Sequence, residues 1–167
     1  MAQRYIKKQK KEEKGQCQDA VQEAMRNLYC MLIKLYIFCD KVQDVSSKRI
    51  LLAALVEASD TRRKDDSYHY PAIAAIADAY TNIPASDPLR EFLVDCVVYQ
   101  GSPSWMHDEN DCYDEYNCYP HEFCFAVMIG LMTKEEGSLA NLDVGDAKYY
   151  QDKLDQHEKR MEEEGGN

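Results

Sequence analysis

Apolar residues in the segment 19–42 recur at alternating spacings of four and three, which is typical of one face of an α-helix. This stripe consists of Val21, Met25, Leu28, Leu32, Leu35, Cys39 and Val42. We expect a helix that begins near Asp19, a suitable capping residue. Its second half adds further apolar residues on the other faces, so we expect protein to surround it. A coiled-coil seam is the alternative, but about three heptads is the lower limit for one, and the broad apolar surface favours a domain core.

A second helix is predicted after Ser46 or Ser47, either of which can cap it, and it ends near Ser59. Its apolar positions are Ile50, Leu51, Leu52, Leu55 and Val56. Charged residues on the other side are expected to face solvent: Lys48, Arg49 and Glu57. The polar segment 60–70 then reads as an exposed connection.

Prolines divide the next region into two helices. Pro71 suits the first turn of a third helix, and Pro84 ends it. Asp87 can cap a fourth helix that opens with Pro88. Because the connection between them is short, we expect the third and fourth helices to be neighbours in space.

An insertion follows at residues 104–119, rich in Asp, Asn, Tyr and Cys and without helical periodicity. A loop of this length is uncommon in a compact domain, so we expect it to be functional or mobile. A fifth helix should begin at Pro120, and because it is apolar nearly all round, we expect it to be a central packing element.

A last helix is predicted from about Val144 into the 160s, with one narrow apolar face and otherwise charged residues. The apolar positions are Ala147, Tyr150, Leu154 and Met161. One interpretation is a solvated helix lying loosely on the body, and the other is a helix that binds a partner.

The pattern as a whole predicts an all-α protein: an irregular bundle of five or six helices with a long acidic loop and mobile termini. We divide it into a charged N-terminal lead at 1–18, a helical domain at 19–137 containing the insertion 104–119, and a charged C-terminal helix and tail at 138–167. No alternating strand pattern occurs.

The formal net charge of −10 and a pI near 4.8 oppose a general affinity for nucleic acid, because phosphate binding needs clustered Lys and Arg. The one basic cluster lies at the N-terminus, where it reads as a solvated tail or a nuclear address. It contains Arg4, Lys7, Lys8, Lys10, Lys11 and Lys14, interrupted by Glu12 and Glu13.

The longest apolar run, 28–39, contains Lys34 and is shorter than the roughly 18 residues that cross a bilayer, so no membrane span is expected. The N-terminus does not have the pattern of a secretory signal. Seven cysteines then favour free thiols in a reducing compartment. We therefore expect an intracellular protein of the cytoplasm or nucleus.

Candidate chemistry is sparse, and we predict no catalytic, cofactor-binding or metal-binding residues and no enzyme. There is no glycine-rich phosphate loop, and carboxylates are too common in this chain to indicate acid and base catalysis. Metal binding is the alternative, through Cys112, Cys118, His121 and Cys124. However, these residues include no close cysteine pair of the kind that structural zinc sites use, and Cys124 also stands where a core residue is expected.

Five segments resemble the helical region of fungal BTB/POZ domain-containing proteins. The run LYIFCDK at 35–41 is similar to a helix that ends in a small residue followed by Asp-Lys. AAIADAYTNIP at 74–84 and SDPLR at 86–90, with LVD at 93–95, resemble paired helices joined by an Asn-Thr-Pro-like turn. PHEF at 120–123 resembles the helix that closes the region.

This resemblance covers roughly residues 28–132 and implies a protein-interaction module, because family members serve as scaffolds and some as substrate adaptors of cullin ubiquitin ligases. It offers no catalytic residues. The N-terminal BTB half, which forms the family's dimer interface, has no counterpart here, and a charged lead stands in its place. We therefore expect partners that are other proteins, with self-association through an exposed apolar patch, and keep a truncated gene product without independent function as an alternative.

Overall fold

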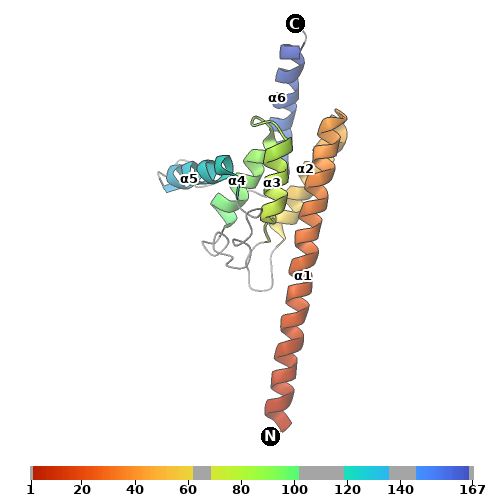
Figure 1. Cartoon of the computed structure of the whole chain (residues 1–167), viewed down its shortest axis with the longest axis vertical. Coiled ribbons are helices and arrows are strands. Elements are labelled where there is room, and N and C mark those ends of the chain that lie inside the picture. The colour runs from red at the N-terminus through yellow and green to blue at the C-terminus, as the bar shows by residue number, and fades with distance from the viewer. Residues whose placement is uncertain (1, 62–68, 102–118, 136–145, 166–167) are drawn as a thin grey trace.

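The computed structural model describes residues 2–61, 69–101, 119–135 and 146–165, and within them the chain has six helices and no strand (Figure 1). The prediction of an all-α bundle is therefore confirmed. The helices are α1 (Ala2–Lys41), α2 (Val45–Asp60), α3 (Ile73–Asn82), α4 (Pro88–Gln100), α5 (His121–Glu135) and α6 (Ala147–Gly165).

The first helix is longer than predicted, because it begins at Ala2 and not near Asp19. The charged lead is thus the first part of α1. Lys, Glu and Gln are good helix formers, and no proline interrupts the first 41 residues. A helix of 40 residues is about 60 Å long, and its N-terminal half extends away from the other helices (Figure 1).

The core meets a face of α1 that coincides only in part with the predicted stripe. The buried side chains are Tyr29, Leu32, Ile33, Tyr36, Ile37 and Cys39. Three members of the predicted stripe, Val21, Leu35 and Val42, are instead exposed. The stripe prediction was wrong at these positions because α2 and α3 pack along the side of the helix that carries the large Tyr29 and Tyr36 rings.

Two helix starts rest on aspartate caps. Asp44, and not Ser46 or Ser47, caps α2: its Oδ1 accepts from the backbone N of Ser47 at 3.0 Å and its Oδ2 from the Ser47 hydroxyl at 2.6 Å. Asp87 caps α4 as predicted, accepting from the backbone N of Leu89 at 2.8 Å.

Arg90 fastens the turn between α3 and α4. Its Nη2 donates to the carbonyl of Tyr80 at 2.6 Å and to that of Ile83 at 2.7 Å, which satisfies carbonyl groups at the end of α3. The guanidinium also lies 4.4 Å from the centre of the Tyr80 ring and donates to Glu122 of α5 at 2.8 Å. One side chain therefore connects three helices.

The fifth helix is a peripheral element, contrary to the prediction of a central one. It packs chiefly on α4, which receives the buried Phe123 and Val127. The two helices approach closely at Gly130, where a Cβ atom would lie 2.7 Å from Cγ2 of Val98. Figure 1 shows α5 projecting sideways from α4. Its apolar composition therefore did not imply burial on all sides.

The sixth helix belongs to the bundle and does not lie loosely on it. It packs against α2 and α4 and buries Tyr150, Leu154 and His157. The Tyr150 hydroxyl donates to Oδ2 of Asp95 on α4 at 2.8 Å. The buried side chains of α6 therefore belong to the same core as those of α1.

Candidate functional site

The side of α5 that faces away from α4 is apolar and exposed. We call it the α5 face: Phe125, Met128, Ile129, Leu131 and Met132. Phe125 is 60% exposed and Met132 is 63% exposed. Single exposed apolar residues are ordinary, but a contiguous exposed patch typically marks an interaction site. The two methionines also give a surface that can adapt its shape to a partner.

A second exposed apolar stripe runs along α1, beside its buried face. We call it the α1 seam: Val21, Ala24, Leu28, Met31, Leu35, Phe38 and Val42. Of these, Leu28 is half-buried and the others are exposed, with Leu35 44% exposed. The spacings alternate between three and four, which is the heptad repeat of a coiled coil.

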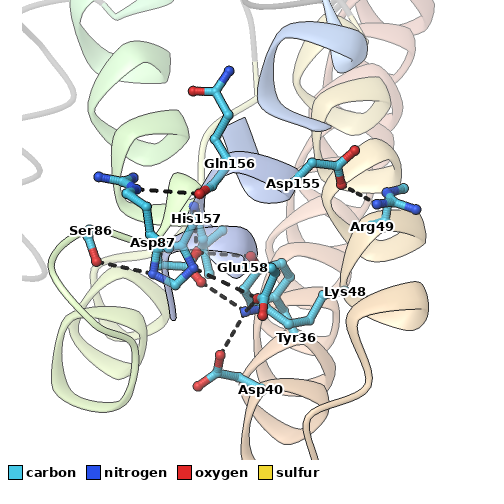
Figure 2. Close-up of polar contacts among 12 residues, drawn as sticks. Tyr36, Asp40, Lys48, Arg49, Ser86, Asp87, Asp155, Gln156, His157 and Glu158 are labelled. Atoms are coloured by element: carbon cyan, nitrogen blue, oxygen red, sulfur yellow. Dashed lines mark hydrogen bonds and ion pairs between the residues drawn. The ribbon is translucent and has the colours of Figure 1, made fainter. Parts of the chain in front are cut away.

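A buried ionic cluster joins the C-terminal end of α1 to the rest of the bundle. Nζ of Lys48, whose side chain is 2% exposed, lies 2.7 Å from Asp40, 3.0 Å from Asp87 and 3.0 Å from Glu158. The Tyr36 hydroxyl donates to the other oxygen of Asp87 at 2.9 Å. Figure 2 shows these side chains converging from α1, α2, α6 and the start of α4.

The electrostatics of this cluster keep its lysine charged. Burial alone would lower the pKa of Lys48, but the neighbouring carboxylates, Asp87 foremost, outweigh it and hold that pKa above its ordinary value. The pKa of Tyr36 is also raised, first by its burial and then by Asp87. An amine that remains protonated cannot act as a nucleophile or base. The cluster is therefore suited to holding α1, α2, α6 and the start of α4 together.

A pocket of about 450 Å³ opens beside the cluster at the C-terminal end of α1. Carboxylates dominate the charge around it: Asp40, Glu158 and Glu162, against Lys48. His157 also lines it and is 4% exposed. Its Nε2 lies 3.1 Å from the Ser86 hydroxyl, while its Nδ1 has no hydrogen-bond partner among the described residues and lies 3.8 Å from Oε1 of Glu158. The pocket thus presents a negative surface.

Only two of the four candidate metal ligands lie within the described residues. Cys112 and Cys118 lie outside them. His121 begins α5 and is exposed, whereas Cys124 is half-buried on the same helix. Within the four described ranges, no group of three or more His, Cys, Asp or Glu side chains is arranged to hold a metal ion.

Sequence reasoning missed the cluster because it assigned Lys48 to the solvent side of α2. Both neighbours in sequence, Ser47 and Arg49, are more exposed than Lys48, so the local pattern gave no sign of its burial. The usable signal was the pair of aspartates: Asp40 ends the apolar run of α1, and Asp87 is a cap that must lie close to a helix start.

No protein-family model, no curated protein and no solved structure matches this chain. Among the helices of the described residues, none is long and apolar enough to cross a membrane.

Proposed function

We propose that this chain is a non-catalytic protein-interaction module that binds another polypeptide through the α5 face. The observation that carries the proposal is the exposure of five large apolar side chains on a helix whose opposite side already packs on α4. Covering such a surface removes apolar area from water, which favours association.

The resemblance to the helical region of fungal BTB/POZ proteins supports the same role. Its motifs fall on the C-terminal part of α1, on α3, on the α3 to α4 turn and α4, and on the start of α5. By this resemblance the chain would serve as a scaffold or adaptor. The seven cysteines favour a reducing compartment for this work, the cytoplasm or nucleus.

Two buried groups of the bundle are held in protonation states that disfavour nucleophilic chemistry. Lys48 is held protonated, and burial raises the pKa of the Cys96 thiol, which disfavours the reactive thiolate. Both groups therefore stabilise the bundle.

Self-association is a second candidate, favoured by the heptad spacing of the α1 seam. The two candidates involve separate helices, so variants can test them independently.

The α5 proposal is tested by changing one exposed side chain at a time. Proteins that co-purify with the full chain from its own cells would be quantified for wild type, for Phe125→Glu and for Ile50→Glu. Ile50 is an exposed apolar residue of α2 and provides the matched control. We expect a specific partner to be lost only with Phe125→Glu. The same partners at the same levels for all three chains would overturn the proposal.

A further inference from the structure

We infer that the α1 seam is covered by the α1 seam of a second copy of this chain, running antiparallel to it. This inference rests on the proposed interaction role but uses a different helix. It follows from the repeat of the seam, from where α1 extends and from the distribution of charge.

The repeat of the seam selects a helix as its occupant. From Val21 to Val42, apolar residues recur at alternating spacings of three and four. This repeat extends over about three heptads. Side chains at this 3.5-residue spacing stay in register only with another helix of the same repeat, by knobs-into-holes packing. The seam of an identical chain has that repeat over the same length.

The seam is also accessible along its length. The other helices of the bundle bury the neighbouring face of α1, which carries Tyr29, Ile33 and Tyr36. Seam residues in the same turns, such as Met31 and Phe38, remain exposed. A second α1 can therefore lie along the seam while the packing of the bundle is unchanged.

Charge favours the antiparallel orientation. The first 18 residues carry six basic and two acidic side chains in a chain whose net charge is −10. Parallel pairing would place two such basic segments side by side, and like charges repel. Antiparallel pairing separates them.

The antiparallel arrangement also brings opposite charges together. With Val21 opposite Val42 of the second copy, the part of α1 before Val21, residues 2–20, extends about 30 Å beyond that point. The end of α6 lies at this end of the bundle (Figure 1). The acidic pocket lies there too, because Glu158 and Glu162 line it together with Asp40 of α1 and Gln43, which follows α1. Each basic segment thus reaches the acidic end of the other copy, and the contact is the same in both directions, as twofold symmetry requires.

Sedimentation equilibrium of the full chain tests the association. We expect a dimer for wild type and at least a 100-fold rise in Kd for the double variant Met31→Glu and Phe38→Glu, because charges would enter an apolar seam. Ile50→Glu is the control and should stay dimeric, and circular dichroism should show unchanged helicity for both. A wild-type chain that is monomeric up to about 100 µM overturns the inference.

A second measurement tests the orientation. Replacing Lys7, Lys8, Lys10, Lys11 and Lys14 by Gln should raise the dimer Kd about tenfold, and added salt should weaken the wild-type dimer, because it screens the attraction between the two ends. A dimer that tightens on either treatment is parallel and overturns the arrangement. Phe125→Glu should remain dimeric, so loss of the α5 partner and loss of the dimer are separate results.

Discussion

Lys48 of α2 and Asp87 at the start of α4 form an ion pair of 3.0 Å although both side chains are almost completely buried. Lys48 also pairs with Glu158 of α6. The next residue, Arg49, pairs with Asp155 of the same helix, but on the surface. Lys48 and Arg49 are consecutive residues of α2, and they make a part-buried and an exposed contact with α6.

This difference predicts unequal effects of two adjacent substitutions. Lys48→Ala should lower the free energy of unfolding by about 3 to 5 kcal/mol, because it leaves the buried Asp87 carboxylate without a counter-charge. Arg49→Ala should cost no more than about 1 kcal/mol, as exposed pairs do. Urea unfolding measures both, and equal losses would show that the Lys48 cluster is not a buried lock.

Stability should depend on the protonation of Asp95. Burial raises its pKa from the ordinary 3.8 to about 6, despite the hydrogen bond from Tyr150 that acts in the opposite direction. Because the folded pKa is the higher one, proton binding favours the folded state. This stabilisation is complete below about pH 4 and is lost as the pH rises through 6, by about 2 kcal/mol in total.

Asp95→Asn supplies the control for that prediction. The amide cannot ionise, yet its oxygen can still accept from the Tyr150 hydroxyl. Denaturant unfolding between pH 4 and pH 7.5 should therefore show a smaller decline for the variant than for wild type. Identical pH profiles would assign the decline to other groups.

Arg90→Lys should destabilise the chain even though the charge is kept. A lysine cannot reproduce the planar group that donates to the carbonyls of Tyr80 and Ile83 and stacks on the Tyr80 ring. We expect a loss of about 1 to 2 kcal/mol in thermal or urea unfolding. Arg160→Lys on the exposed side of α6 is the control, and a loss as large there would remove the special role of Arg90.

Elemental analysis separates the interaction module from the metal-binding alternative. We expect the purified chain to hold no stoichiometric zinc, since its cysteines lack the close pairing of structural zinc sites. Zinc at one equivalent that disappears in Cys118→Ser or Cys124→Ser would instead establish the metal-binding function. Cooperative thermal unfolding of the same sample would count against a truncated product without independent function.

Local patterns predicted the helices well but not how they pack. Proline, glycine and aspartate signals act within a few residues, so the Asp87 cap and the end of α4 at Gly101 could be read from the sequence. Which face of α1 is buried depends on where α2 and α3 lie, and two adjacent apolar stripes such as those of Leu32 and Leu35 cannot be ranked by periodicity.

The exposure of the α5 face and the burial of Lys48 also depend on packing, so local sequence patterns could not predict them. The apolar composition of α5 was evident, but only its edge position on α4 shows that Phe125 and Met132 face outward. The burial of Lys48 depends on Glu158, which is 110 residues away, and no local pattern reports such a distant partner.

The contribution of α6 also constrains the order of folding during translation. Until residue 158 has been synthesised, Lys48 lacks one of its three carboxylates, and the sites that receive Tyr150 and Leu154 stay open to water. A nascent chain that pauses earlier would display those sites to chaperones, and a premature stop codon ahead of α6 would leave a product marked for degradation rather than a smaller working module.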